Sequence, residues 1–394
     1  MESAEWPSRI RHYSLNYPIG QGACGLVWSA TVTDGVYEDR EVALKIINFD
    51  KFDNLNIDEI KKEINIMSEY SHENLISSYV SFIDKSEMVI VMPLIDAGSC
   101  ADIIKETFSK GIEDESIIAA IIKSVLLGLD YLHKNNEMHR DIKAGNVFIK
   151  RDGSIYLGDF GVAASLKTGE KRKTLAGSPC WMAPEVIEQF KGYDFSADIW
   201  SLGITAIELA EGKAPYVEMS AMKILLAILN SDPPSISDSH FSKEFKDFVD
   251  CCLQKDASKR WSAEKLLKHK FINKACDPEY LETELLSKLQ DLKERIPESL
   301  RIQGEEFLEE RKRREKKKKS KKKKTSKKGK KDGDSKGGPW DFGSGSYSDA
   351  KAKAKLKGEE YDADSYAKVP ESTYEKPSNY KDDMDDFGLD SGED

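Results

Sequence analysis

One short run of polar residues near the middle of the chain carries the residue types that phosphate chemistry needs. It reads His-Arg-Asp-Ile-Lys-Ala-Gly-Asn over residues 139–146, and Asp-Phe-Gly begins thirteen residues after Asn146. Asp141 is a candidate base that orients a hydroxyl nucleophile, and Lys143 is a candidate for neutralising a transferred phosphate. Asn146 and Asp159 offer the oxygen atoms that Mg²⁺ prefers as ligands. This combination predicts phosphoryl transfer.

The residues between Asn146 and Asp159 predict how those two oxygen donors are brought together. Two mainly apolar runs, Val-Phe-Ile at 147–149 and Ser-Ile-Tyr-Leu at 154–157, lie on either side of an Arg-Asp-Gly turn at 151–153. Two apolar runs around an Asp-Gly turn are typical of a β-hairpin. The hairpin would have Asn146 at its entrance and Asp159 just beyond its exit, so we expect the two side chains to converge.

A glycine-rich segment near the N-terminus is a second candidate for phosphate contact. Residues 20–27 read Gly-Gln-Gly-Ala-Cys-Gly-Leu-Val and lie between two predicted strands. Glycine lets backbone N–H groups approach phosphate oxygens closely, because it has no Cβ. A dinucleotide-binding loop would be followed by a helix, whereas a strand follows here. Taken alone, the pattern fits a structural turn and a phosphate cover equally well.

Lys45 lies in the sequence Val-Ala-Leu-Lys, inside an otherwise apolar predicted strand. A buried charge there must be paired or bound to an anion, because burying it alone is costly. Glu63 on the following predicted helix is the expected partner, and Glu59, one turn away, competes with it. The alternative is a strand lysine that faces outward.

The hydrophobic pattern divides the chain into a sheet-rich part and a helical part. Strands are predicted at 15–20, 26–32, 41–47, 80–83 and 88–92, with one helix at 57–67. After Pro93 the pattern becomes helical. A helix capped by Asp114 or Ser116 is predicted through 132, and others at 197–210, 222–230, 244–253 and 263–267. A charged helical stretch is expected from 279 to about 319, interrupted near Pro297. The predicted fold class is therefore α+β, in which the sheet-rich part comes first along the chain and the helical part follows it.

These motifs together resemble the eukaryotic protein kinase domain over residues 13–272. Ala-Pro-Glu at 183–185 is similar to the close of the family's activation segment, which would begin at Asp159. Asp-Ile-Trp-Ser-Leu-Gly at 198–203 is similar to the helix that supports the catalytic loop. In the family Arg260 would pair with Glu185. The resemblance implies a bilobal fold, with a five-stranded antiparallel N-lobe and one helix over 13–93 and a mainly helical C-lobe over 94–272.

The resemblance also implies a role for each matching residue. Asp141, Lys143, Lys45 and Glu63 would be catalytic, and Asn146 and Asp159 would bind Mg²⁺. ATP would be bound by Ile19, Gly20, Gln21, Gly22, Ala23, Cys24, Gly25, Val27, Ala43, Lys45, Met92 and Leu94. Lys143 two residues after Asp141 resembles the serine/threonine class, so the implied reaction is transfer of the ATP γ-phosphate to protein hydroxyls.

Two longer segments resemble a narrower group within the family. They are Gly-Ser-Pro-Cys-Trp-Met-Ala-Pro-Glu at 177–185 and Gly-Ile-Thr-Ala-Ile-Glu-Leu-Ala at 203–210, and they are similar to sterile-20-like kinases of the germinal-centre-kinase group. Lys-Thr at 173–174, with 186–189 and 192–195, most resembles the oxidative-stress-responsive (Fray/SPAK) subfamily. That resemblance implies a stress or osmotic and ion-homeostasis signalling cascade with an upstream activating kinase.

In that subfamily Thr174 would be the activating phosphosite. Its phosphate would pair with Arg140 through a charge-assisted contact that orders the activation segment. The alternative is a loop threonine that is never modified.

The sequence departs from the subfamily pattern at several places. Ser178 stands where the group usually has Thr, and Trp261 replaces a usual proline. The subfamily's C-terminal domain, which recognises Arg-Phe peptides, is not visible, so the resemblance leaves open whether regulation of cation-chloride cotransporters applies. A pseudokinase or scaffold that acts by binding is the alternative function, although every catalytic position is filled.

Charge is distributed very unevenly behind a net charge of -10. Residues 311–331 hold sixteen Lys or Arg against one Glu, whereas residues 332–394 hold seventeen acidic against eight basic residues. We expect a helical extension over 273–310, then a Lys-rich segment and an acidic, disordered tail. The Lys-rich segment fits a solvated spacer, a partner of the acidic tail, nuclear import or an anion-binding module. It has no aromatic residues, so we expect no direct contact with nucleic acid.

The composition and cysteine pattern predict a soluble, reduced, intracellular protein, and the cytoplasm is its expected location. The six cysteines show no metal-binding spacing, and Met1 is not followed by a signal-peptide pattern. No uncharged apolar run approaches the roughly 20 residues that a membrane span needs, so no transmembrane segment is expected. Protein substrates are the expected partners, nuclear entry through residues 311–331 is an alternative location, and the sequence does not set the oligomeric state.

Overall fold

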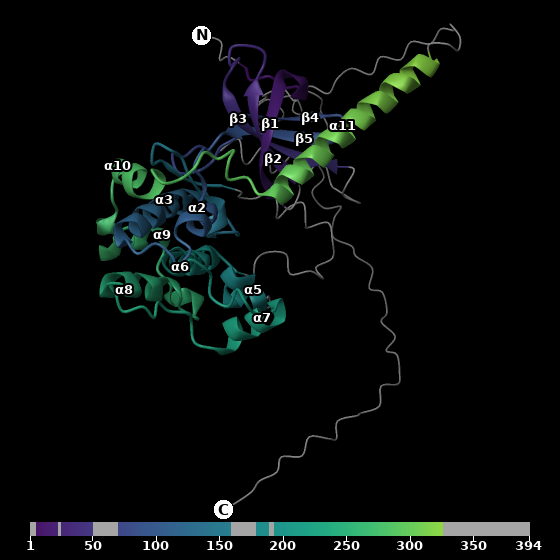
Figure 1. Cartoon of the computed structure of the whole chain (residues 1–394). Helices are drawn as coiled ribbons and strands as arrows, with labels where there is room; N and C mark the ends of the chain where they lie inside the picture. Colours follow the sequence, from purple (N-terminus) through teal and green to yellow (C-terminus); the bar gives the residue numbers. More distant parts are fainter. Residues whose placement is uncertain (1–4, 23–24, 50–69, 159–178, 189–192, 326–394) are drawn as a thin grey trace, which may run out of the picture. The chain divides into compact units, whose positions relative to one another are not determined.

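In the computed structural model, drawn in Figure 1, the chain consists of two compact units, residues 1–323 and 324–394. All the elements described below belong to the first unit, apart from the last two residues of the final helix. The structure describes residues 5–22, 25–49, 70–158, 179–188 and 193–325.

The N-terminal lobe is built on a five-stranded antiparallel sheet with strand order β1-β2-β3-β5-β4. The strands are β1 (Tyr13–Gly22), β2 (Gly25–Val32), β3 (Glu41–Asn48), β4 (Val80–Asp84) and β5 (Glu87–Pro93). All five predicted strands are confirmed. The predicted helix at 57–67, with Glu63, lies outside the described residues.

The two faces of this sheet have different roles, because successive side chains of a strand point to opposite sides. Trp28 of β2 is paired with Leu44 of β3, and both belong to a buried cluster on the outer face. Val27 and Lys45, the neighbouring pair in the register, point to the other face. Four residues predicted to contact ATP, Val27, Ala43, Lys45 and Met92, therefore share one face, and the apolar cluster covers the other.

The C-terminal lobe is mainly helical. Its helices are α2 (Cys100–Thr107), α3 (Glu115–Lys134), α5 (Pro184–Glu188), α6 (Ser196–Glu211), α7 (Ala221–Asn230), α8 (Lys243–Cys252), α9 (Ala263–Leu266) and α10 (Pro278–Tyr280). Short 3-10 turns lie at η3 (Ala144–Asn146), η4 (Pro179–Trp181), η5 (Ala257–Lys259) and η6 (Lys270–Lys274). The five helices predicted between 114 and 267 are confirmed. α3 begins after Asp114, whose carboxylate accepts the Ser116 N–H at 2.8 Å. α2 was not predicted, and it is capped by the Ser99 side chain.

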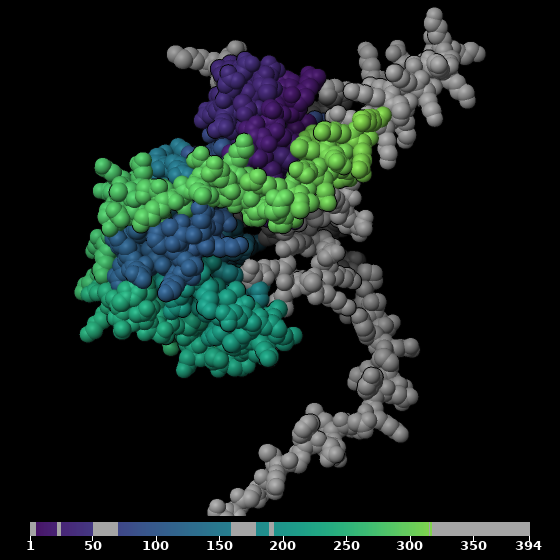
Figure 2. All heavy atoms as spheres, in the orientation of Figure 1, coloured from purple at the N-terminus to yellow at the C-terminus, as the bar shows by residue number. Residues whose placement is uncertain are grey.

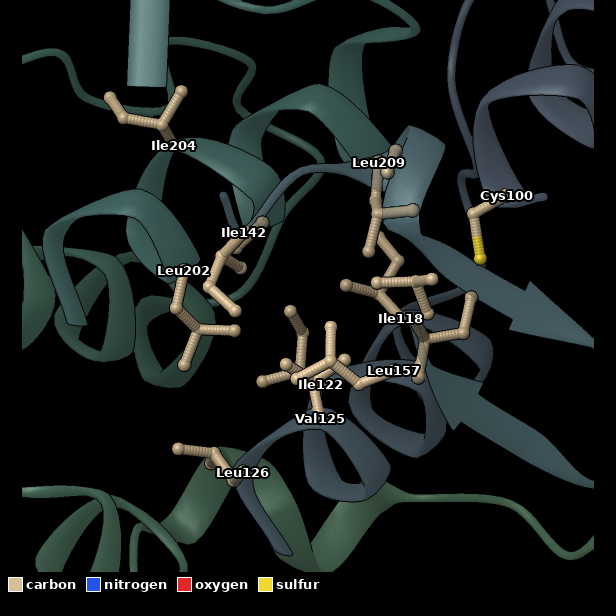
Figure 3. Packing of buried hydrophobic residues seen from close by; sticks show 14 of the residues in the cluster. Cys100, Ile118, Ile122, Val125, Leu126, Ile142, Leu157, Leu202, Ile204 and Leu209 are labelled. Carbon is tan, nitrogen blue, oxygen red and sulfur yellow. The ribbon is translucent and has the colours of Figure 1, made fainter. Parts of the chain in front are cut away.

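Figure 3 shows the core of this lobe, where α3 meets α6 and the polar run of the sequence. Ile122 and Val125 of α3 face Leu202 of α6, and Ile142, between two candidate catalytic residues, is buried among them. Among the described residues, α3 alone is long and apolar enough to span a membrane, but 61% of its apolar window is buried inside the protein. Its length is explained by this position in the core.

The predicted hairpin after Asn146 is confirmed. β7 (Val147–Ile149) and β8 (Ile155–Leu157) pair antiparallel, and β6 (Gly98–Ser99) adds a third strand. Gly153 in the turn has a φ of 77°, a left-handed conformation that glycine adopts without strain. The Gly158 N–H donates to the carbonyl of Asn146 at 2.9 Å, so the exit of the hairpin lies beside its entrance.

The segment after residue 277 is partly helical. α10 and a π-helical turn, η7 (Leu281–Leu286), are followed by a non-helical stretch and then by α11 (Glu298–Thr325). α11 begins directly after Pro297, so the predicted interruption is confirmed. The helix continues past the expected end near 319 and runs through residue 311, where the Lys-rich segment begins.

Candidate active site

The loop that carries the polar run is held by one buried carboxylate of α6. Asp198 accepts the backbone N–H of His139 at 2.9 Å and that of Arg140 at 2.8 Å, one on each oxygen. His133 of α3 lies 2.9 Å from the same carboxylate through Nε2. Asp198 is only 1% exposed, so these charge-assisted bonds are shielded from water. The position of the loop is therefore set by the core helices.

Arg140 has an unusual backbone conformation at this point. Its φ is 69°, in the left-handed region that costs a non-glycine residue about 1–3 kcal/mol. The bond from its N–H to Asp198 offsets part of that cost. Its side chain is exposed beside Asp141, so a charged group is available to an anion.

His139 ties the loop to the end of the hairpin. Its Nδ1 accepts the backbone N–H of Asp141 at 3.3 Å, so the ring proton must lie on Nε2. Nε2 then donates to the carbonyl of Gly158 at 3.1 Å. Gly158 directly precedes Asp159, so His139 fixes the loop relative to the start of the Asp-Phe-Gly motif.

Asp141, Lys143 and Asn146 form one compact group. Lys143 Nζ lies 2.6 Å from Asp141 Oδ2, and the Asn146 amide N–H₂ donates to the same oxygen at 2.8 Å. The amide also donates to the Asp141 carbonyl at 2.7 Å. Among the described residues, Oδ1 of Asp141 is the carboxylate oxygen left to accept a hydrogen bond, and the side chain is 39% exposed. Three of the predicted site residues are thus brought together.

The same geometry fits the oxygen chemistry of a divalent cation. Because the Asn146 nitrogen is used by Asp141, its amide oxygen is the atom left for a cation. Asn146 is buried, so this orientation is fixed. An amide oxygen beside a carboxylate is a donor set that Mg²⁺ accepts. Asp159, the other predicted ligand, lies outside the described residues.

Glu208 of α6 joins the loop to the last part of the predicted activation segment, at Trp181, and sequence reasoning gave it no role. Its Oε2 accepts the Ala144 N–H at 2.9 Å and the Trp181 indole N–H at 3.0 Å. Burial raises the pKa of Glu208, and these two hydrogen bonds offset part of the rise. A single acid in the apolar sequence Ile-Thr-Ala-Ile-Glu-Leu-Ala was the available signal, because a buried carboxylate needs partners.

The expected ATP-contacting residues lie on neighbouring strands of the N-terminal sheet. Lys45 is buried in β3, where it pairs in register with Val27 of β2 and Ile90 of β5. Ala43 pairs with Met92, the last residue before Pro93. Gly20 pairs with Val27, and Gly22 pairs with Gly25. Ile19 and Gln21 continue β1, and Leu94 directly follows β5.

Gly25 has a structural reason of its own. A Cβ at this position would lie 2.0 Å from the carbonyl oxygen of Ile46 in β3, whereas a Cβ on Gly20 would meet only the Val27 side chain at 3.9 Å. Gly25 therefore allows β2 to pair with β3. Of the predicted site residues, Ala23, Cys24, Glu63, Asp159 and Thr174 lie outside the described residues.

The expected pair of Glu185 and Arg260 is present. Arg260 Nη1 lies 2.6 Å and Nη2 lies 2.8 Å from the two Glu185 oxygens, and the arginine side chain is 0% exposed. The guanidinium also lies over the ring of Trp200 in α6, 5.1 Å from its centroid. Trp261, which replaces the usual proline, is covered by Lys265, whose Nζ lies 3.6 Å from the ring centroid.

Comparisons with known proteins show which family the chain resembles. The protein kinase domain family matches residues 13–272. The chain is 45% identical to the serine/threonine-protein kinase fray2 of Dictyostelium discoideum over 295 residues, which are 74% of this chain and 28% of that protein. It is 42% identical to germinal center kinase 3 of Caenorhabditis elegans over 307 residues, covering 72% of this chain and 51% of that protein.

A third relative is matched over most of its length. The serine/threonine-protein kinase ppk11 of Schizosaccharomyces pombe is 43% identical over 259 residues, 66% of this chain and 80% of that protein. The chain thus spans about a quarter of fray2 and half of germinal center kinase 3. The chain belongs to the protein kinase family and to its serine/threonine kinases, and it is similar to members named for the Fray and germinal center kinases.

Proposed function

We propose that this protein transfers the γ-phosphate of ATP to serine and threonine hydroxyls of protein substrates, with Mg²⁺ as its metal. The observation that carries the proposal is the Asp141 carboxylate, which is held by Lys143 and Asn146 on a loop that is fixed to Asp198. Phosphoryl transfer depends on positioning and charge neutralisation, and this group supplies both.

Each side chain has a distinct role in this proposal. Asp141 Oδ1 accepts the hydrogen bond of the substrate hydroxyl and orients it for attack. Lys143, held at 2.6 Å from Asp141, places one positive charge beside the phosphate that moves. Lys45 and the glycine-rich backbone bind the phosphates of ATP. Asn146 and Asp159 would hold Mg²⁺, which neutralises phosphate charge when bound.

The activity is tested with the full chain and Asp141→Asn, using ATP-dependent phosphorylation of dephosphorylated casein. Loss of the oriented carboxylate should lower the rate by about 10²–10⁴. The exposed Asp232→Asn is the matched control and should keep the wild-type rate. A wild-type signal at background, equal to that of Asp141→Asn, would establish the pseudokinase alternative instead.

The choice of Mg²⁺ is tested by removing divalent ions with EDTA and adding back single ions. Mg²⁺ should restore the activity, and Ca²⁺ should not, because Ca²⁺ takes longer and more variable bonds to oxygen. Asn146→Ala should raise the Mg²⁺ concentration needed for half-maximal activity. Full activity in EDTA would contradict the metal requirement.

Activation by phosphorylation of Thr174 is supported by the exposed Arg140 side chain beside the candidate base. A phosphothreonine would give Arg140 a bidentate partner. Phosphatase treatment should lower the activity of wild type and have little further effect on Thr174→Ala or Arg140→Gln. Phosphosite mapping of active protein decides the matter, because an active form with unmodified Thr174 would contradict the proposal.

The resemblance to the Fray group supports a place in a stress or ion-homeostasis cascade, downstream of an activating kinase. We expect a cytoplasmic protein, with residues 311–331 as the route into the nucleus. Imaging a fluorescent fusion before and after osmotic stress, together with a variant in which the lysines of 311–331 are glutamines, tests both points. Identical distribution of the two fusions would exclude the nuclear route.

A further inference from the structure

The C-terminal helix α11 contacts the N-terminal lobe along one face. Leu300, Gly304, Phe307, Leu308 and Arg311 recur at spacings of three and four, so they lie on the same side of the helix. Phe307 and Leu308 pack against the outer-face cluster of the sheet. Figure 2 shows the yellow-green start of α11 against the purple N-terminal residues.

The contacted part of the sheet is the β1–β2 hairpin that carries the glycine-rich segment. The Phe307 ring lies 5.7 Å from the ring of Trp28 in β2, and Trp28 is paired with Pro18 of β1. Val27, which precedes Trp28 in β2, is paired with Gly20 and points to the opposite face of the sheet. α11 therefore presses on the back of the residues that are expected to cover ATP.

The contact leaves no spare room. A Cβ added to Gly304 would lie 2.8 Å from the Pro18 ring and 3.2 Å from Trp28. Trp28 is 1% exposed, and its indole N–H has no hydrogen-bond partner among the described residues. Packing against neighbours such as Phe307, rather than hydrogen bonding, fixes the orientation of the indole.

Arg311 completes the contact at its far end. Its guanidinium lies 3.6 Å from Glu87 of β5 and 5.6 Å from the Phe307 ring centroid. The first residue of the predicted Lys-rich segment is therefore an anchor on the sheet.

The other end of the extension is anchored to the C-terminal lobe. Arg151, in the turn of the β7–β8 hairpin, donates to the carbonyls of Leu289 and Gln290 at 3.0 and 2.6 Å. Arg295 donates to the carbonyl of Ala97 at 2.6 Å, just beyond the end of β5. Because the extension is bound to both lobes, it cannot move freely with the N-terminal sheet. It therefore restricts the movement of the β1–β2 hairpin.

We propose that Gly304, Phe307 and Arg311 are positioning residues for phosphoryl transfer, because they set the height of the β1–β2 hairpin above bound ATP. This inference rests on the proposed kinase function. These residues touch neither ATP nor substrate. Gly304 and Phe307 act through Pro18 and Trp28, and Arg311 holds α11 on Glu87 of β5. Their loss should therefore weaken ATP binding selectively and leave the binding of the protein substrate unchanged.

The test measures kcat and the KM values for ATP and for a peptide substrate, using full-length Phe307→Ala. We expect the KM for ATP to rise by about tenfold, since small misplacement of a positioning group has large effects, with the KM for peptide within twofold. Phe307→Leu, which keeps an apolar side chain, should restore most of the affinity for ATP. Ile302→Ala is the control, because Ile302 lies on the same helix and is 48% exposed.

A second variant keeps the test decisive if Phe307→Ala does not fold. Gly304→Ala adds a single methyl against Pro18 and should raise the KM for ATP in the same direction. Unchanged KM for ATP in the folded variants, or an equal rise in both KM values, overturns the positioning role while leaving the kinase activity intact. Absence of phosphorylation in wild type would instead refute the proposed function itself.

Discussion

Replacing Arg260 by methionine tests how strongly the ion pair with Glu185 stabilises the C-terminal lobe. The arginine side chain is 0% exposed and makes two bonds of 2.6 and 2.8 Å to the carboxylate. Methionine would fill much of the volume but leave Glu185 without its arginine partner. Removing one partner of a buried pair costs about 3–5 kcal/mol.

The same ion pair can also be weakened by substituting Glu185. Glu185→Gln keeps one acceptor oxygen, so one of the two bonds survives and the expected cost is about 1.5–3 kcal/mol. Once either partner is gone, the second substitution should cost little more. The double variant should therefore be less destabilised than the sum of the singles, because the two residues share one interaction.

Thermal unfolding of the full chain, followed by circular dichroism, measures these effects. A domain of this size loses about 2 °C in Tm per kcal/mol, so Arg260→Met should unfold about 6–10 °C below wild type. Lys213→Met is the control, because Lys213 and Glu218 form a pair of the same 2.6 Å length that is exposed to solvent. A Tm change for Arg260→Met no larger than that of Lys213→Met, or strict additivity in the double variant, would refute the reasoning.

Three further predictions follow from groups described above. Burial raises the pKa of Glu208 above its ordinary value of 4.5, so the folded state holds this proton more tightly and its contribution to stability falls as pH rises from 4.5 through the raised pKa. Glu208→Gln should remove this pH-dependent contribution to stability, so the difference in Tm between wild type and the variant should change across the acidic pH range. Plots of Tm against pH that run parallel for the two proteins would contradict this prediction. The pKa of Cys251 is raised to about 11 by burial and by Asp247, and Cys100, Cys180, Cys252 and Cys276 are raised as well. At pH 8 these five thiols should react slowly with DTNB until the protein is unfolded, and fast labelling of two or more thiols in the native protein would be inconsistent with this. Gly25→Ala should lower the Tm, since its Cβ would overlap the Ile46 carbonyl and overpacking costs about 1–3 kcal/mol, whereas Gly20→Ala should leave the Tm near that of wild type.

Local sequence patterns were sufficient for most elements. Strand β3 and helix α3 follow from apolar periodicity, and the β7–β8 hairpin follows from its Asp-Gly turn. The cluster of Asp141, Lys143 and Asn146 was also predictable, because all three lie within six consecutive residues. These elements could be predicted from the sequence because residues close together in the chain determine them.

Contacts between residues far apart in the sequence could not be predicted in the same way. Nothing in the local sequence indicates that Glu208 accepts the Ala144 N–H, 64 residues earlier. Phe307 lies in a strongly charged helix, where a single aromatic residue is a weak signal of docking to a sheet. Such contacts depend on tertiary packing, which overrides local preference. The positions of Glu63, Asp159 and Thr174, and the chemical role of every predicted site residue, stay predictions.

The anchoring of the catalytic loop by α6 also sets an order of events during protein synthesis. The backbone bonds of His139 and Arg140 reach Asp198 across 59 and 58 residues, and Ala144 reaches Glu208 across 64. A ribosome that adds about 5–20 residues per second releases α6 roughly 3–12 seconds after the loop. During that interval the loop has none of these partners, so a nascent chain that stops before α6 cannot assemble the site. Catalytic competence should therefore appear only after α6 has left the exit tunnel and packed against α3.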